Sequence, residues 1–361
     1  MAQTGSGYCP SQLVHHSHLT PNQPLDLYRE DTPMTDLMLP ETATEQAIAD
    51  IWATRTGVSP VGKHDRFSDL GGSSLAAETA LVELRNRLGR EIGAQLLATD
   101  PTVAELAEAI EETGRQDFHR GLETCTHLTP GNDGKPMLFC FAGAGASAVC
   151  FLDLARYFSD SYDVWAFHAH GFHSKGRADR SLAAKARRHV PKLMEIQPTG
   201  PLTLIGHSFG GHVAMEAARQ LTEQGRVINQ VLLLDTFLGA VDGGSVADYR
   251  SEAPAALPPL RERLLTHWRI LTAGLIPRDV ATQQSVFWEQ EIRIQNRIQC
   301  ESVPPGTTVL VSDEGQAQQE LWLAIDQPPT TVRTSGSHLS VLSDRHTLAL
   351  LRSQLATPES A

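Results

Sequence analysis

The sequence has few cysteines, no long apolar run and no cluster of basic residues, and each absence excludes a class of protein. Its five cysteines are scattered and never form a CxxC pair, which argues against a disulfide framework and against a zinc site. No apolar stretch approaches the roughly 20 residues that cross a bilayer. Lys and Arg number 30 against 42 Asp and Glu, a net charge of -12 without any basic run. Nucleic acid and membranes are therefore poor candidates for partners.

The first residues, MAQTGSGYCPSQ, lack the basic start and the apolar stretch of a signal peptide. Together with the scattered cysteines, this predicts a cytoplasmic protein. The 361 residues exceed one typical domain, and their 41% hydrophobic content is sufficient for a buried core. We therefore expect two domains, one small and one of ordinary enzyme size.

The first part of the chain is predicted to be helical. Residues 1–40 are rich in Pro, Ser, Thr and His without periodicity, and we interpret them as a flexible leader. Helical patterns follow within residues 41–115, and in the last of them Thr102 and Glu105 have the spacing of a capping box. These patterns predict a small all-α bundle. Residues 116–134 are polar and turn-rich, which is typical of a linker.

Within residues 135–357 short apolar runs alternate with amphipathic stretches. PMLFCFA, DVWAFHA, PLTLIGH and VINQVLLLD are near-continuous apolar segments, as expected of strands in a parallel sheet that helices cover on both faces. The alternation lapses into a mostly helical insert at about 236–305 and then resumes with TTVLVS and TTVRTSG. This pattern predicts an α/β domain with a helical insertion.

The sharpest signal is GHSFG at residues 206–210, between the apolar strand PLTLI and the helix GHVAMEAARQ. A turn this tight needs glycine on both sides of the serine, and it lifts the serine hydroxyl above the edge of the sheet. This is the pattern of the nucleophile elbow of an α/β-hydrolase, and it predicts Ser208 as a nucleophile. A Gly/Ser turn without chemistry is the alternative.

A serine hydroxyl needs a base to become nucleophilic, and in this fold serine, acid and histidine follow in that order. His338 lies in a loop after the last predicted strand and before the last predicted helix, where the base is expected. We favour it over His207 and His212, which flank the elbow, and over His346, which falls inside the following helix.

The acid that orients the histidine has two candidates. Asp235 ends the segment VLLLD, and Asp313 follows VLVS one strand later. Either carboxylate could reach the imidazole from the carboxyl edge of the sheet, and either could be a turn-capping aspartate. The residues alone leave the two nearly even.

The negative charge that develops on the substrate carbonyl needs preorganised N–H donors. We expect one donor to be the amide of Phe209, directly after the nucleophile. The other is expected from the loop FAGAGASA, where Ala144 is our choice and Gly143 the next. A plain glycine-rich turn is the alternative. The loop is not a phosphate loop, since no GK[ST] follows it.

A second motif, FSDLGGSSL at residues 67–75, resembles the signature DxFFxLGGxSL of peptidyl carrier domains of nonribosomal peptide synthetases. It departs from that signature at Ser68, where a second Phe is usual. The resemblance implies that Ser74 carries 4′-phosphopantetheine; an ordinary helix cap is the other use of such a serine. A helix N-terminus also favours the phosphodiester. Basic residues at the end of this helix, Arg85, Arg87 and Arg90, favour a peptidyl over a fatty-acyl carrier.

From about Lys135 to Leu355 the chain resembles the type I thioesterases that terminate peptide and polyketide synthetases, because GHSFGG, VLLLD and GSHL match in order and spacing. In that family the acid follows the strand after the elbow helix, which favours Asp235. The insert at 236–305 corresponds to the family's mobile lid. Aromatic residues within it could line an acyl pocket or pack the lid: Trp268, Phe287 and Trp288.

The resemblance implies a carrier–thioesterase didomain that holds an acyl or peptidyl thioester and releases it by hydrolysis, cyclisation or acyl transfer. Its expected partners are a phosphopantetheinyl transferase and upstream adenylation and condensation enzymes acting in trans. Alternatives are a carrier module with an inactive hydrolase domain and a small-molecule esterase. LTPNQPLDLY in the leader resembles the LTPNGKxDR segment that ends an adenylation domain, with Pro24 where the catalytic lysine would fall. The leader could thus be a relic of such a domain.

Overall fold

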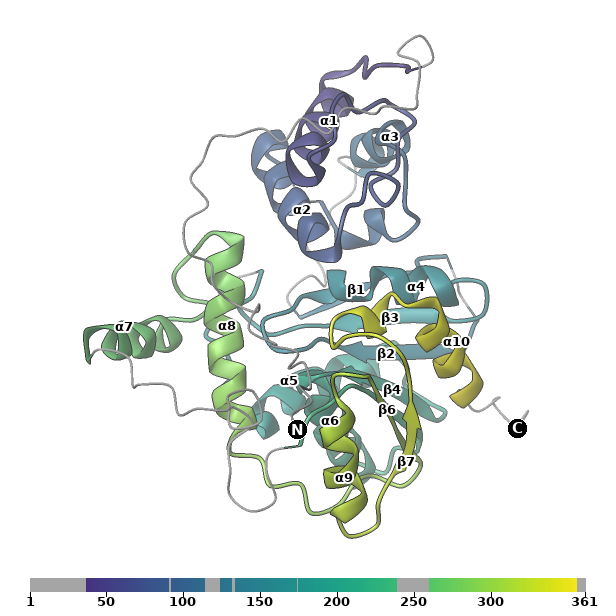
Figure 1. The fold of residues 1–361 in the computed structure, drawn as a ribbon, viewed down its shortest axis with the longest axis vertical. Coiled ribbons are helices and arrows are strands. Elements are labelled where there is room, and N and C mark those ends of the chain that lie inside the picture. The colour runs from purple at the N-terminus through teal and green to yellow at the C-terminus, as the bar shows by residue number, and fades with distance from the viewer. Residues whose placement is uncertain are drawn as a thin grey trace, which may run out of the picture.

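The computed structural model describes residues 37–90, 92–113, 124–131, 134–173, 175–238 and 260–355. The leader predicted at residues 1–40 lies outside the described residues except for its last four, as does the first part of the predicted linker. Figure 1 shows a helical unit, formed by the first helices of the chain, above a sheet that is flanked by helices.

The helical unit contains three α-helices and a short 3-10 helix: α1 (Ala43–Thr56), α2 (Ser74–Leu88), η1 (Ala94–Leu97) and α3 (Val103–Thr113). The predicted capping box is present before α3, where Thr102 and Glu105 each bond to the other's backbone N–H. At the centre of the bundle the rings of Trp52 and Phe67 pack with centroids 5.3 Å apart. The small all-α bundle predicted from the sequence is confirmed.

The second unit is built on a seven-stranded sheet in the order β1-β3-β2-β4-β5-β6-β7. Its strands are β1 (Cys125–His127), β2 (Met137–Phe141), β3 (Asp163–Phe167), β4 (Leu202–His207), β5 (Ile228–Leu234), β6 (Thr307–Val311) and β7 (Thr330–Arg333). All neighbouring strands are parallel except β1, which runs antiparallel to β3. The predicted parallel α/β sheet is confirmed.

Helices cover both faces of this sheet because alternate residues of each strand point to opposite sides. Leu138 and Cys140 of β2 share one apolar cluster with α4 and α10, whereas Phe139 and Phe141 share another with α5, α6 and α9. These helices are α4 (Leu152–Phe158), α5 (Leu182–Ile196), α6 (Phe209–Glu223), α9 (Gln316–Ala324) and α10 (Arg345–Gln354); 3-10 turns are η2 (Ala148–Phe151) and η4 (Ser340–Leu342).

Strand β1 is a difference from the sequence interpretation, because it lies within the stretch 116–134 that was expected to be a linker. Its three residues are too few to give a periodic signal. The strand is fixed instead by β3, where the buried Asp163 accepts hydrogen bonds from Thr129 and Trp165 and contacts the ring of His127. The sheet therefore begins before residue 135.

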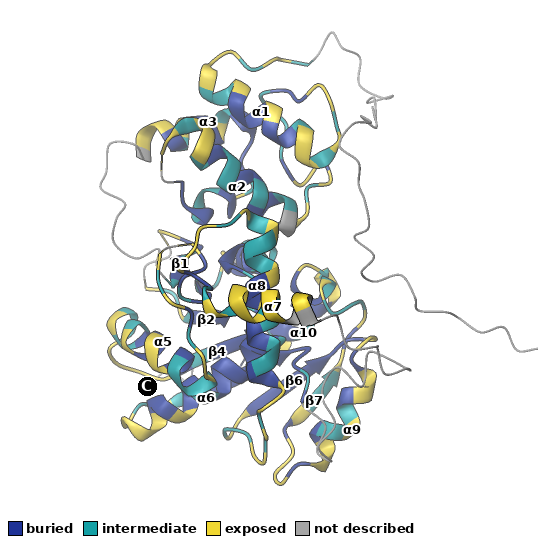
Figure 2. Ribbon diagram, turned by 90° about the vertical axis from the view of Figure 1, so that its left-hand side faces the viewer, coloured by how far each residue is buried: buried dark blue, intermediate teal, exposed yellow. Residues whose placement is uncertain are grey.

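The insertion expected at 236–305 contains α7 (Leu260–Leu271) and α8 (Val280–Gln295). The two helices differ in burial (Figure 2): α8 buries one side against the body of the molecule, whereas α7 exposes apolar residues along much of its length. The most exposed of these are Leu264, Trp268 and Leu271. Of these two helices, α8 is the one for which the described residues include side chains buried in the core.

The helical unit and the sheet unit are in direct contact. The buried carboxylate of Glu78 on α2 accepts a hydrogen bond from Ser147, and its other oxygen lies 3.4 Å from the His173 ring. Arg156 on α4 donates to two backbone carbonyls at the end of η1, those of Leu97 and Ala98. One apolar cluster contains residues of both units. The side of α2 that carries Glu78 thus faces the α/β unit.

Candidate active site

The turn between β4 and α6 is a strained elbow. Ser208 has φ 53° and ψ -125°, a conformation that non-glycine residues rarely adopt. A Cβ added at Gly210 would lie 2.0 Å from the Phe141 carbonyl oxygen, and one at Gly206 would lie 2.4 Å from the Cα of Gly211. Only glycine fits at these positions, so the strand and helix can approach closely enough to hold the strained serine.

Three residues from separate parts of the chain form a hydrogen-bonded series at the carboxyl edge of the sheet. The Nε2 atom of His338 lies 2.9 Å from Ser208 Oγ, and its Nδ1 lies 2.7 Å from Asp235 Oδ2. The Ser208 and His338 side chains are half-buried, whereas Asp235 is buried. This arrangement allows the imidazole to take a proton from the serine while the carboxylate fixes the ring's orientation and tautomer.

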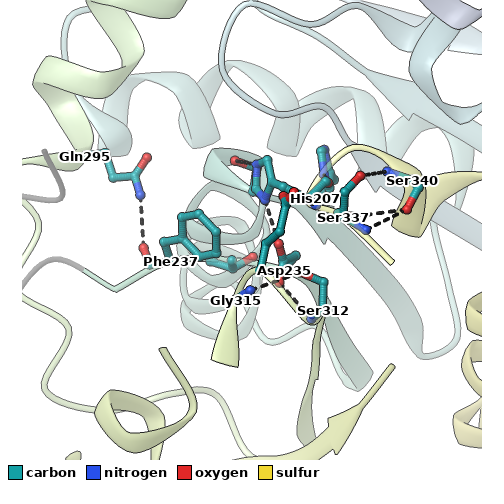
Figure 3. Close-up of polar contacts among 12 residues, drawn as sticks. His207, Asp235, Phe237, Gln295, Ser312, Gly315, Ser337 and Ser340 are labelled. Carbon is teal, nitrogen blue, oxygen red and sulfur yellow. Dashed lines mark hydrogen bonds and ion pairs between the residues drawn. The ribbon is translucent and has the colours of Figure 1, made fainter. Parts of the chain in front are cut away.

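The Asp235 carboxylate is held from two sides, as Figure 3 shows. Its Oδ1 accepts a hydrogen bond of 2.9 Å from the backbone N–H of Ser312, and its Oδ2 faces His338. Burial raises the pKa of the Asp235 carboxyl, but the hydrogen bonds from His338 and Ser312 outweigh burial and hold the pKa below its ordinary value. The carboxylate is therefore charged wherever the neutral imidazole acts as a base.

The other candidate acid, Asp313, does not contact the imidazole. Its side chain is exposed and accepts a hydrogen bond of 3.1 Å from the N–H of Gly336, and its own N–H donates to the Gly336 carbonyl. Asp313 thus connects the end of β6 to the loop that carries His338. Of the two aspartates left open by the sequence, the one that meets the histidine ring is Asp235.

Among the described histidines, the one whose ring hydrogen-bonds Ser208 Oγ is His338. His207 and His212 are buried, and burial lowers the pKa of each ring to about 4. The Nε2 atom of His207 donates to the backbone carbonyl of His338, and that of His212 donates to the carbonyl of Phe237. His346 lies in α10. His207 and His212 support the loops of the site in neutral form.

Two contacts of His338 carried no signal in the sequence. The ring of Phe237, just after β5, lies with its centroid 4.7 Å from that of His338. The Glu314 carboxylate accepts a hydrogen bond of 2.8 Å from the His338 backbone N–H. These contacts join segments that are distant in the sequence, so neither a motif nor a periodicity could have revealed them.

The loop after β2 approaches the elbow from the other side. Phe209 is the first residue of α6, so its N–H has no acceptor within the helix. Among the described residues no acceptor is recorded for the N–H of Ala144, whereas the Gly145 N–H donates to Glu291 on α8. Gly143 packs against the elbow, since a Cβ there would lie 3.2 Å from the Ser208 Cβ. The amides of Phe209 and Ala144 are therefore available to a developing oxyanion.

The carrier motif lies at the start of α2. Ser74 is the first residue of this helix; its side chain lies outside the described part of the structure. The helix cap is Ser73, whose hydroxyl accepts the Ala76 N–H, so Ser74 is not the N-cap that the sequence left as an alternative. The first turn carries no acidic residue. A helix N-terminus whose first turn lacks acidic residues fits a phosphodiester on Ser74.

Other residues of the carrier motif are used inside the helical unit. The hydroxyl of Ser68, at the position where phenylalanine is usual, hydrogen-bonds the carboxylate of Asp100. Arg85 donates to the Ile92 carbonyl and Arg87 pairs with Asp50 at 2.7 Å. Two of the three arginines that suggested a peptidyl carrier thus have partners within the bundle.

The aromatic residues proposed for an acyl pocket separate into two kinds. Phe287 is fully buried and packs on Phe172 with ring centroids 5.2 Å apart, so it belongs to the core beneath the lid. Trp268 and Trp288 are 51% and 40% exposed. Trp288 also borders the loop of Gly145, because a Cβ on that glycine would lie 2.8 Å from the Trp288 Cβ.

Two family models match the chain. The model described as phosphopantetheine attachment site matches residues 46–110, and the model described as thioesterase domain matches residues 136–250. The chain thus joins a carrier domain, which is modified with 4′-phosphopantetheine, to a thioesterase domain.

No described helix could span a membrane, and the described residues contain no metal-binding group of three His, Cys, Asp or Glu side chains.

The chain is also similar in sequence to parts of longer curated proteins. The chain is 32% identical over 243 residues to malpinin synthetase of Mortierella alpina and 32% identical over 225 residues to the dimodular nonribosomal peptide synthase of Bacillus subtilis (strain 168). These matches cover 65% and 61% of this chain but only 3% and 9% of those relatives. The chain therefore spans a small part of the curated proteins that it matches.

Among solved structures, a four-domain nonribosomal peptide synthetase in its holo form, bound to AMP and glycine, aligns with a TM-score of 0.50 at 20% identity. The alignment covers 88% of this chain and 26% of that one, and at this identity it shows the fold alone. Together, the two family matches show a carrier domain and a thioesterase domain in one chain, and the relatives show its similarity to parts of much longer synthetases.

Proposed function

We propose that this chain releases an acyl or peptidyl group from its own carrier domain through the nucleophile Ser208, the base His338 and the orienting acid Asp235. The observation that carries the proposal is the unbroken hydrogen-bonded series from Ser208 Oγ through the imidazole to the buried carboxylate. Such a series serves acyl transfer, because each proton that must move has an acceptor already in place.

Ser74 is the proposed attachment point of 4′-phosphopantetheine, which when bound supplies a thiol that carries the acyl group as a thioester. The contact of α2 with the α/β unit through Glu78 supports delivery within one molecule. Delivery from a tethered carrier replaces tight substrate binding by a high effective concentration. The carrier requires a phosphopantetheinyl transferase, and we propose adenylation and condensation enzymes upstream as the source of the acyl group.

In the first half of the reaction His338 Nε2 takes the proton of Ser208 Oγ as the oxygen attacks the thioester carbonyl. The N–H groups of Phe209 and Ala144 stabilise the oxyanion. The carbon–sulfur bond breaks, the imidazolium returns its proton to the leaving thiolate, and the acyl group remains as an ester on Ser208. Asp235 stays charged throughout and stabilises the imidazolium.

In the second half His338 removes a proton from water, or from a hydroxyl or amine, as that nucleophile attacks the ester. The same two N–H groups hold the second oxyanion, and the imidazolium then protonates Ser208 Oγ. The product is an acid, a macrocycle or a transferred acyl group, according to which nucleophile enters the site.

The test uses the full chain with a phosphopantetheinyl transferase. We expect intact mass to increase by one phosphopantetheine group in the wild type and not in Ser74→Ala. After loading with an acyl group, we expect Ser208→Ala to slow release by at least about 10³-fold. Release from Ser208→Ala at the wild-type rate would refute the mechanism. Absence of the mass increase would favour a small-molecule esterase, and modification without any wild-type release would favour a carrier module.

A further inference from the structure

Helix α8 reaches the active site through a buried charged pair. Lys185 on α5 and Glu291 on α8 are both buried, and the Lys185 ammonium contacts Glu291 Oε1. The second oxygen of the same carboxylate, Oε2, accepts a hydrogen bond of 2.7 Å from the backbone N–H of Gly145. A carboxylate with one oxygen on a cation and the other on an amide is fixed in orientation.

The hydrogen bond from Gly145 lies next to the proposed oxyanion donor, because Gly145 directly follows Ala144 in the loop after β2. Gly145 has φ +67°, and a Cβ there would lie 2.5 Å from the Gln284 carbonyl oxygen on α8. The loop therefore lies against the backbone of α8, in a conformation suited to glycine. Its N–H points to Glu291, so the neighbouring peptide that contains the Ala144 N–H is held in one orientation.

The same charged pair lies close to the side chain of Phe209, whose backbone N–H is the other proposed oxyanion donor. The Lys185 ammonium is 5.8 Å from the centroid of the Phe209 ring. Phe209 is the first residue of α6. One turn further along α8, Gln295 donates to the Phe237 carbonyl, as Figure 3 shows, and the Phe237 ring packs on His338. One face of α8 therefore contacts both the loop of Ala144 and the residue that packs on the histidine.

We propose that Glu291 is a positioning residue for acyl transfer: its carboxylate, held by Lys185, fixes the Gly145 amide and thereby aims the Ala144 N–H at the substrate oxyanion. This inference rests on the proposed function, in which Ala144 is an oxyanion donor.

The inference predicts weaker stabilisation of the transition state and unchanged substrate binding. A misplaced N–H weakens stabilisation of the oxyanion, which forms only as the reaction proceeds, so kcat should fall while KM is unchanged. Removal of a complete oxyanion donor costs about 10²- to 10³-fold in kcat. Loss of the Glu291 contact leaves the N–H donor present but displaced. We therefore expect kcat to fall by about 10- to 100-fold.

Single replacements in this pair would leave a buried charge alone and could prevent folding. The experiment therefore compares two double variants, Lys185→Met with Glu291→Gln and Lys185→Met with Glu291→Met. Both variants remove both charges and share the Lys185→Met change, and Gln and Met each match Glu in length. They differ in whether an oxygen remains at position 291 for the Gly145 N–H. Gln290→Met is the control, since the buried Gln290 donates to the Asp179 carbonyl from the same helix.

The readout is kcat and KM of the full chain with an acyl N-acetylcysteamine thioester, alongside the melting temperature. We expect the Gln290→Met control to retain kcat within a fewfold, and the Met/Met variant to have a kcat about 10- to 100-fold lower than the Met/Gln variant at unchanged KM. Equal kcat for the two double variants would overturn the inference, as would a rise in KM alone. These outcomes are separate from failure of the proposed function, which would appear as an active Ser208→Ala variant.

Discussion

Replacement of Asp235 by asparagine tests the site most sharply, because the structure fixes how the new amide must lie. Both oxygens of Asp235 accept hydrogen bonds, one from the Ser312 N–H and one from Nδ1 of His338. In the Asp235→Asn variant one of these two positions becomes an NH2 donor. If the donor faced Ser312, two donors would meet in a buried site, so the amide oxygen should stay there.

The NH2 group would then face the histidine ring and require Nδ1 to act as an acceptor. The single proton of the neutral imidazole would move to Nε2, which could no longer take the proton of Ser208. Where the same replacement produces this wrong tautomer in a serine–histidine–aspartate enzyme, kcat falls by about 10⁴-fold. That factor equals about 5 kcal/mol in activation free energy. We expect a loss of this order without a large change in KM.

The assay is hydrolysis of an acyl N-acetylcysteamine thioester by the full chain, with the melting temperature as a check on folding. Asp313→Asn is the matched control. Its amide oxygen can still accept the Gly336 N–H, and because the side chain is exposed we expect a change of less than about threefold, the order of 0.5 kcal/mol. If Asp235→Asn retained activity within tenfold of the wild type, or if Asp313→Asn were the inactive variant, the reasoning about the tautomer would be wrong.

Two further predictions concern the elbow and its buried histidine. Gly210→Ala should lower the melting temperature and abolish thioester hydrolysis, because the new Cβ would lie 2.0 Å from the Phe141 carbonyl oxygen; an active, equally stable variant would contradict this. His207, whose pKa burial lowers to about 4, should make the wild type less stable as the pH falls from about 6.5 to about 4, since only the unfolded chain then binds the proton. The full effect is about 3 kcal/mol. Urea unfolding at pH 7 and pH 5 should show a smaller pH effect in His207→Gln than in the wild type, and equal effects would refute the prediction.

Much of the architecture was readable from the sequence because its signals are local. The strands β2 to β6 are near-continuous apolar runs, and their burial on both faces follows directly from that pattern. The capping box at Thr102 and Glu105 and the glycines around Ser208 act through neighbours within a few residues. Strand β1 escaped prediction because it is held by contacts with β3 and not by a pattern of its own.

What the sequence determined by itself was the set of elements, the strained turn at Ser208 and the position of Ser74 at the start of a helix. What only the tertiary structure decided was which distant side chains meet. Ser208 and His338 are 130 residues apart, and Asp235 rather than Asp313 faces the ring because the paths of β5 and β6 place it there. The Lys185–Glu291 pair likewise forms only when the folded chain brings α5 and α8 together, with α8 against the loop of Gly145. Local patterns depend on near neighbours along the chain, whereas contacts of this kind depend on how the whole chain packs.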